Sequence, residues 1–236
     1  SRGLGDVYKR QGLDLEMPGD TAICRKWILD GLKDGTLAEE SLNSAAENVL
    51  TAVDTFAKKI ADDADFEAND RLACEIAEDC AVLLKNDGVL PLAEGERIFV
   101  VGELFEKMRY QGAGSSMINP TKITTPKAAF DAMRISYGYS RGYAENPTEP
   151  QQAWIDEAVA ASAQYDTIAV FAGLTDYAES EGCDREHMRL PENQLALIDA
   201  LCRTGRKIIV VLFGGSPVEL PCAGKVGAML NMSLPG

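Results

Sequence analysis

The chain contains the apolar run Thr167-Ile168-Ala169-Val170-Phe171-Ala172. No polar residues alternate with the apolar ones there, which predicts a β-strand that is buried on both of its faces. A polar loop at residues 179–185 comes next, and then a helix over 191–203, with Pro191 in its first turn and Gly205 just past its end. A buried strand followed by a covering helix predicts a parallel sheet.

The same alternation of strands and helices extends from Ile98 to the end of the chain. Several of the strand-forming stretches are again continuous apolar runs, so helices should cover both faces of the sheet. The sequence therefore predicts an α/β sandwich, a mostly parallel sheet with helices on both faces. The other strands are expected at 98–101, 134–137, 207–213 and 226–231, and the other helices at 127–133 and 151–163.

Two helices are predicted before this domain. Thr36-Leu37-Ala38-Glu39 has the pattern of a capping box, and apolar residues at helical spacing follow it as far as Phe56. A second helix is expected over 70–85, ending before Asn86-Asp87-Gly88. We place the domain junction near residue 88 and expect the sandwich over 89–236.

Composition limits the classes of function. The chain has 236 residues and 46% hydrophobic content, enough to bury a core in about one to two domains. It carries 23 basic and 37 acidic residues, so nucleic acid and anionic membranes are poor partners. No apolar run approaches the roughly 20 residues that span a bilayer, and no signal peptide is visible, so we expect a cytoplasmic protein.

The cysteine and histidine content disfavours several kinds of site. The six cysteines show no Cys-x-x-Cys spacing, and we expect free, buried thiols rather than disulfides. His187 is the only histidine, so a Ser-His-Asp triad or a histidine zinc site would depend on that one residue. We predict no metal and no cofactor.

Three loops follow predicted strands and are candidates for a shared site, and the first two should lie at the same edge of the sheet. The first, Arg109 to Ser116, is rich in glycine but lacks the Gly-Lys-Ser/Thr ending of a phosphate-binding loop. The second, residues 179–185, holds three carboxylates and an arginine. The third, Gly214-Gly215-Ser216-Pro217, is more typical of a tight turn than of a catalytic loop.

The acidic loop has two interpretations. It could be a solvated turn in which Asp184 and Arg185 pair with the backbone or with each other. Alternatively, Glu179 or Glu181 is a general acid whose pKa is raised by the neighbouring carboxylates and by partial burial. Composition does not distinguish these interpretations.

Five ordered segments resemble glycoside hydrolase family 3, and its β-glucosidase-like members in particular. The first, Gly12 to Pro18, is similar to the Gly-x-Asp-x-x-Met-Pro segment at the last strand of that family's TIM barrel. Residues 80–92 are similar to the entry into its C-terminal domain. The remaining segments are 109–116, 179–194 and 214–221.

The resemblance implies a two-domain retaining exo-glycosidase that releases terminal β-linked glucose or a related sugar. Residues 12–88 would be the end of the barrel domain and a helical linker. Residues 1–11 look like a translated sequencing adapter and are left out of the fold prediction. The nucleophile of such an enzyme is a barrel Asp, which we expect upstream of Gly12, so this chain alone should be inactive.

The resemblance also assigns roles to residues of this chain. Glu181 is the predicted acid/base, with Glu179 as the alternative. A carbohydrate is the implied substrate. The positions implied to bind substrate or brace the loops are Asp14, Arg109, Gln111, Gly112, Ser115, Asp184 and Arg185.

Three alternatives remain at this stage. The longer protein could be a catalytically inactive homologue that only binds carbohydrate, or its specificity could be that of a β-xylosidase or an arabinofuranosidase. The glycine-rich loop could also belong to an unrelated flavodoxin-like or nucleotide-binding domain, for which it is the only support.

Overall fold

The computed structural model describes residues 12–17, 20–57 and 64–235. The adapter prediction for residues 1–11 lies outside these ranges. The chain divides into two compact units, Ser1–Asp65 and Phe66–Gly236, and each is described by itself. The division falls earlier than the predicted junction near residue 88, because the segment that follows Asp65 groups with the sheet.

The first unit contains the helices α2, Thr21–Asp34, and α3, Glu39–Phe56. The side chain of Asp20 caps α2 by accepting hydrogen bonds from the backbone N–H groups of Ala22 and Ile23, each with a donor–acceptor distance of 3.0 Å. Gly35 ends this helix with a left-handed φ of 77°, a conformation that glycine adopts without a steric penalty.

The predicted capping box at residues 36–39 is wrong. The N-cap of α3 is Ala38, which has no side chain able to cap the helix. Thr36 instead donates its hydroxyl to Asp34 over 2.6 Å, within the turn that leaves α2. The Thr36 hydroxyl, which the motif predicted as the helix cap, is therefore engaged in a local hydrogen bond in that turn.

The second unit is built on a six-stranded sheet with strand order β1-β6-β5-β4-β2-β3. All neighbouring pairs are parallel except β1 with β6. The predicted mostly parallel sheet is confirmed. Its strands are β1 (Val82–Asn86), β2 (Ile98–Val101), β3 (Tyr137–Ser140), β4 (Thr167–Gly173), β5 (Lys207–Phe213) and β6 (Ala228–Asn231).

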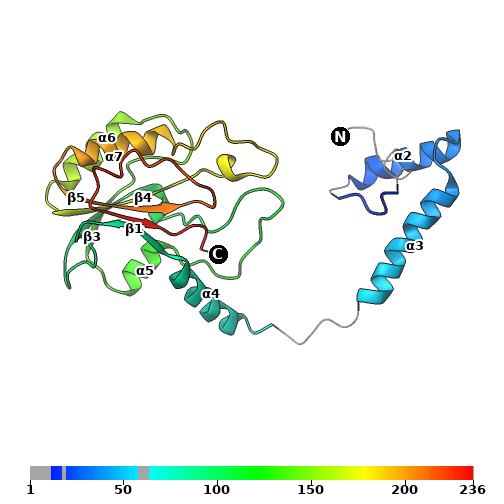
Figure 1. The fold of residues 1–236 in the computed structure, drawn as a ribbon, viewed down its shortest axis with the longest axis horizontal. Coiled ribbons are helices and arrows are strands. Elements are labelled where there is room, and N and C mark those ends of the chain that lie inside the picture. Colours follow the sequence, from blue (N-terminus) through cyan, green and yellow to red (C-terminus); the bar gives the residue numbers. More distant parts are fainter. Residues whose placement is uncertain (1–11, 18–19, 58–63, 236) are drawn as a thin grey trace. The chain divides into compact units, whose positions relative to one another are not determined.

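Helices lie on both faces of this sheet (Figure 1). The helices α6, Gln152–Ser162, and α7, Glu192–Cys202, cover one face, and α5, Pro126–Ala132, lies on the other. The unit begins with α4, Phe66–Cys80. Within the described ranges, no helix is both long enough and apolar enough to cross a membrane.

The core centres on β4, whose seven residues are all buried. Burying a large apolar side chain contributes about 1.5–3 kcal/mol, so this strand is a main source of stability. Beside it, the ring of Phe105 lies 5.1 Å from that of Phe171 and 5.2 Å from that of Phe130. The same core fixes the ends of β2 and β4, where the polar loops begin.

The predicted helix over 70–85 is wrong beyond residue 80. There α4 ends, and β1 forms an edge strand antiparallel to β6, with Val82 opposite Asn231. Lys85 donates from Nζ to the carbonyls of Ala223, over 2.8 Å, and Val226, over 2.7 Å. Pairing with a strand that is distant in sequence therefore overrides the local helical pattern.

Two strand boundaries also differ from prediction. Strand β3 spans Tyr137–Ser140 and shares only Tyr137 with the predicted strand 134–137, because Arg134 has a left-handed φ of 57° as the chain leaves α5. Strand β6 begins at Ala228 rather than 226.

The cysteines are less buried than expected. Only Cys222 is buried, whereas Cys74, Cys80 and Cys183 are exposed. Cys80 lies at the last position of α4 and Cys183 in the acidic loop. The expectation of buried thiols is therefore wrong for these three cysteines.

Candidate active site

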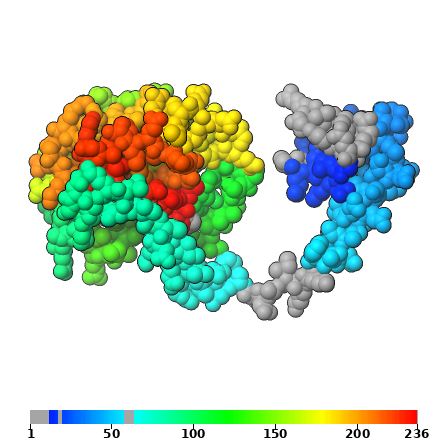
Figure 2. Space-filling view, in the orientation of Figure 1, coloured from blue at the N-terminus to red at the C-terminus, as the bar shows by residue number. Residues whose placement is uncertain are grey.

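The glycine-rich loop after β2 and the acidic loop after β4 lie side by side, as predicted. Ala113 forms a parallel β-bridge with Ser180. The backbone N–H of Ala113 donates to the carbonyl of Glu179 over 3.1 Å, and that of Glu181 donates to the carbonyl of Ala113 over 3.3 Å. In the space-filling view, the acidic loop (yellow) and the glycine-rich loop (green) meet at the surface of the second unit (Figure 2).

The close approach of the loops depends on Gly114. Its φ of 96° is strained for any other residue, and a Cβ built there would lie 2.9 Å from the Cβ of Glu181. A glycine at this position therefore lets the two backbones touch.

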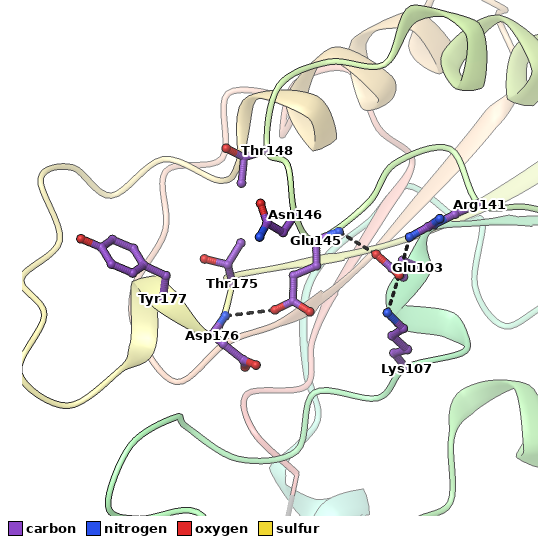
Figure 3. A pocket seen from close by; sticks show the side chains of 9 residues that line it. All are labelled: Glu103, Lys107, Arg141, Glu145, Asn146, Thr148, Thr175, Asp176 and Tyr177. Atoms are coloured by element: carbon purple, nitrogen blue, oxygen red, sulfur yellow. Dashed lines mark hydrogen bonds and ion pairs between the residues drawn. The ribbon is translucent and has the colours of Figure 1, made fainter.

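A cavity of about 630 Å³ lies beside the base of the acidic loop (Figure 3). Neither Glu181 nor any residue of the glycine-rich loop is among its lining residues. The side chains that line it come from the segments after β2, β3 and β4: Glu103, Lys107, Arg141, Glu145, Asn146, Thr148, Thr175, Asp176 and Tyr177.

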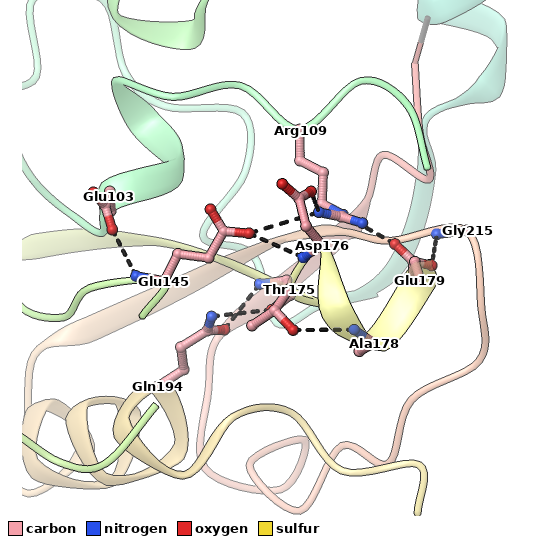
Figure 4. A network of polar contacts seen from close by, with 10 residues as sticks. Glu103, Arg109, Glu145, Thr175, Asp176, Ala178, Glu179, Gln194 and Gly215 are labelled. Carbon is pink, nitrogen blue, oxygen red and sulfur yellow. Dashed lines mark hydrogen bonds and ion pairs between the residues drawn. The ribbon is translucent and has the colours of Figure 1, made fainter. Parts of the chain in front are cut away.

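A buried arginine joins these segments (Figure 4). The side chain of Arg109 is only 3% exposed and donates from Nε to Glu179 over 3.0 Å. Its Nη1 forms ion pairs with Asp176 and, at 3.7 Å, with Glu145. Three carboxylates surround one guanidinium, which compensates for much of the cost of burying the cation.

The alternative acid/base, Glu179, is fully engaged in this network. Its side chain is 5% exposed, and one carboxylate oxygen accepts from Arg109. The other oxygen accepts from the backbone N–H of Gly215 over 2.6 Å. Glu179 therefore links all three loops, and neither of its oxygens is left over for a substrate.

Glu181, by contrast, is exposed at the end of the paired loops. Its Oε2 accepts from the backbone N–H of Ser115 over 3.1 Å. Hydrogen bonds from the hydroxyl and the backbone of Ser115 lower the pKa of the Glu181 carboxyl. The direction is opposite to the expected rise of this pKa, because Glu181 is exposed and its hydrogen bonds with Ser115 favour the ionised form.

The end of β4, where the acidic loop begins, is fixed by Gln194 of α7. The side-chain amide of Gln194 donates to the carbonyl of Gly173 over 3.0 Å and accepts from its N–H over 2.9 Å. Thr175 then accepts from the N–H of Ala178 at the start of the short helix η2, Tyr177–Glu179. These hydrogen bonds therefore set the direction in which the loop leaves the sheet.

Of the two other charged residues in the acidic loop, only Arg185 braces it. Arg185 donates from Nη1 to the carbonyl of Pro217 over 2.9 Å and so ties the loop to the segment after β5. The side chain of Asp184 is exposed and forms no hydrogen bond or ion pair with any residue that the structure describes. The bracing role expected of Asp184 is absent here.

The glycine-rich loop is held by its own residues. Gln111 accepts from the N–H of Ile118 over 2.9 Å and donates to the carbonyl of Ile118 over 3.2 Å. Gly112 lies against the carbonyl of Glu179: a Cβ built at Gly112 would lie 3.4 Å from that carbonyl oxygen. Gln111 and Gly112 therefore shape the loop, whereas Ser115 contacts Glu181 directly.

Asp14 belongs to the first unit, where Asn48 donates to it over 3.1 Å. This contact joins the segment before α2 to α3. A role for Asp14 at a sugar site stays a prediction.

Sequence reasoning missed three participants in the site. The Gly214 to Pro217 segment, interpreted as a tight turn, contacts both Glu179 and Arg185. Asp176 and Glu145 were not singled out, although both follow strands of the sheet. Their position after β4 and β3 is the signal that could have identified them.

Nothing in the described part of the chain resembles a metal site. No group of three or more His, Cys, Asp and Glu side chains there is arranged to hold an ion. The polar groups that meet at this edge are carboxylates, a guanidinium, hydroxyls and backbone N–H groups. These groups are suited to proton transfer and to binding hydroxyl-rich ligands.

The family assignment follows from comparison with known proteins. The model of the glycosyl hydrolase family 3 C-terminal domain matches residues 81–236. The chain therefore belongs to glycoside hydrolase family 3, which confirms the resemblance found in the sequence segments.

Named relatives agree with this assignment. The chain is 41% identical to the thermostable β-glucosidase B of Acetivibrio thermocellus over 233 residues, which cover 95% of this chain and 31% of the relative. It is 30% identical to the exo-α-(1→6)-L-arabinopyranosidase of Bifidobacterium longum, covering 95% of this chain and 31% of that protein. The chain thus spans about a third of the length of these relatives.

Solved structures show the same fold. The crystal structure of a family 3 β-glucosidase from Bifidobacterium adolescentis matches 97% of this chain and 34% of its own, with a TM-score of 0.75 and 34% sequence identity.

Proposed function

We propose that this chain is the acid/base-bearing part of a retaining exo-β-glucosidase. The single observation that carries the proposal is the contrast between its two glutamates. Glu181 is exposed at the tip of a braced loop pair, whereas Glu179 is buried with both oxygens occupied. An acid/base must reach the substrate, and of these two residues only Glu181 is free to do so.

In the proposed reaction, an Asp in the barrel of the longer protein attacks the anomeric carbon. Glu181 donates its proton to the leaving glycosidic oxygen as that bond breaks, which leaves a glycosyl ester on the Asp. The Glu181 carboxylate then takes a proton from water, whose oxygen attacks the same carbon and releases the sugar and the Asp. Two displacements retain the anomeric configuration.

This role requires a protonated Glu181 at the working pH. In the chain alone, its hydrogen bonds with Ser115 favour the ionised form. In the longer protein, we expect a second carboxylate at roughly 5–5.5 Å and the exclusion of water to raise this pKa. The barrel would therefore supply both the nucleophile and the environment that makes Glu181 an acid.

Glucose is the favoured sugar, because the relative at 41% identity is named a β-glucosidase. Arabinopyranosidase specificity is the second candidate, since a relative with that name is 30% identical over a similar stretch. The barrel would decide between them, because it would hold most groups that grip the terminal sugar.

The test is a chimera in which residues 12–236 replace the matching segment of the Acetivibrio β-glucosidase B. We expect the chimera to hydrolyse aryl β-glucosides. Glu181→Ala should slow substrates with poor leaving groups by about 10²- to 10⁴-fold and activated aryl glucosides much less, because a good leaving group needs little protonation.

The matched control is Glu179→Gln in the same chimera. It should weaken the loop network and reduce turnover of both substrate types by similar factors. A leaving-group dependence at Glu179 instead of Glu181 would transfer the assignment. A correctly folded chimera without any turnover would favour a homologue that only binds carbohydrate.

A further inference from the structure

The cavity beside the acidic loop lies where ligands gather in open parallel sheets. Strands β2 and β4 are neighbours in the sheet. After β2 the chain continues to β3, which pairs with β2 on the side away from β4. After β4 the chain continues to β5, which pairs with β4 on the side away from β2. The connecting helices α5 and α7 accordingly lie on opposite faces (Figure 1). The chain therefore leaves a crevice beyond the carboxyl ends of β2 and β4, and Glu103 and Asp176 from these ends line the cavity.

The charged groups on one side of this cavity satisfy one another (Figure 3). Glu103, which is 4% exposed, accepts from Lys107 and Arg141, each over 2.7 Å, and from the N–H of Glu145 over 2.6 Å. Glu145 in turn accepts from the N–H of Asp176 over 3.0 Å. This network forms a rigid polar wall.

The opposite side offers polar groups without partners. The side chains of Asn146, Thr148 and Tyr177 form no hydrogen bond with any residue in the described ranges, and Figure 3 shows them around the same space. Tyr177 is 76% exposed, so its ring is available for stacking. Together they provide an amide, a hydroxyl, a phenol and an aromatic face.

The loop that carries two of these groups is held in place from behind. Asn193, which is 1% exposed, donates from its side-chain amide to the carbonyls of Ala144, over 2.7 Å, and Pro147, over 3.1 Å. The positions of Asn146 and Thr148 are therefore fixed before any ligand arrives, which lowers the entropic cost of binding.

We infer that this cavity binds an uncharged, hydroxyl-rich ligand the size of a mono- or disaccharide. Its volume of about 630 Å³ suits a small molecule. Amide and hydroxyl groups pair with sugar hydroxyls, and the face of Tyr177 packs against the C–H face of a sugar ring. Three carboxylates against two cationic side chains in the lining disfavour a phosphate or another anion.

The inference does not depend on the acid/base role of Glu181. It is tested on the full 236-residue chain by following amide chemical shifts during titration with D-glucose, D-xylose and glucose 6-phosphate. We expect shifts confined to the segments that line the cavity, largest at residues 144–148 and 175–177, saturating in the millimolar range for at least one neutral sugar. Glucose 6-phosphate should bind more weakly than glucose.

Variants of exposed side chains localise the binding. Tyr177→Ala and Asn146→Ala should each weaken it by about three- to tenfold. The control Met133→Ala changes a side chain that is 72% exposed and does not line the cavity, and it should bind like the unaltered chain. The rest of the amide spectrum reports whether each variant is folded.

Three results would overturn the inference. One is the absence of saturable shifts with either neutral sugar. Another is a set of shifts centred on Ser115, Glu181 and Gly215 instead of the cavity. The third is tighter binding of glucose 6-phosphate than of glucose.

Discussion

The guanidinium of Arg109 donates from Nε to the carboxylate of Glu179 over 3.0 Å, and both side chains are at least 95% buried. This ion pair joins the loop after β2 to the loop after β4. Because Glu179 also accepts from Gly215, the same contact extends to the loop after β5. The mutual position of three loops, and with it the position of Glu181, therefore depends on one buried pair.

Arg109→Ala should lower the free energy of unfolding by about 3–5 kcal/mol, because it leaves Glu179 buried without its cation. Urea denaturation of the chain measures this loss. Arg203→Ala is the matched control, since Arg203 is 75% exposed and its pair with Asp199 should contribute less than about 1 kcal/mol. Equal losses for the two variants would contradict the assigned role of Arg109.

Gly114→Ala should separate the paired loops, because the new Cβ would lie 2.9 Å from the Cβ of Glu181. Loss of the hydrogen bonds with Ser115 should let the pKa of Glu181 rise toward its ordinary value of 4.5. Titration of the Glu181 carboxyl by NMR measures this change. Gly95→Ala shares the left-handed backbone but has no atom within 4 Å of the new Cβ, and it should leave the pKa unaltered.

Glu103 should make stability depend on pH. Burial raises the pKa of its carboxyl, but hydrogen bonds from Lys107 and from the N–H of Glu145, with the charge of Arg141, lower it more, so the net pKa is below its ordinary value of 4.5. A carboxyl whose pKa is lowered by folding stabilises the fold fully above its unfolded pKa. That stabilisation is lost as the pH falls through the folded pKa.

Urea denaturation at a series of pH values tests this dependence. When the pH is lowered from neutral to below the ordinary pKa of 4.5, the free energy of unfolding should fall less for Glu103→Gln than for the unaltered chain. The two chains should therefore differ most at neutral pH and converge in acid. A difference that is constant at every pH would contradict the prediction.

Much of the fold could be predicted because its strands carry strong local signals. The runs that became β4 and β5 are continuous and apolar, and β5 was predicted with its observed bounds. The same reasoning failed for β1, whose short apolar run Val82-Leu83-Leu84 fits a helix as well as a strand and which pairs with the distant strand β6. Long-range pairing of this kind is not encoded in local periodicity.

The site was predictable in place but not in detail. Loops that follow parallel strands must meet at one edge, so the contact between the Arg109 and Glu181 loops could be expected. The distinction between Glu179 and Glu181 could not, because both occur in one acidic stretch. It depends on a partner 70 residues away, Arg109, and on the backbone N–H of Gly215.

The central claim is that Glu181 is the acid/base of a retaining glycosidase. Its most direct test is the Glu181→Ala variant of the chimera with the Acetivibrio β-glucosidase B, assayed on an activated aryl β-glucoside with added azide. Azide needs no general base, so it should attack the glycosyl-enzyme in place of water. The account predicts accelerated turnover and β-glucosyl azide as the product. No acceleration by azide, or formation of the α-anomer, would contradict it.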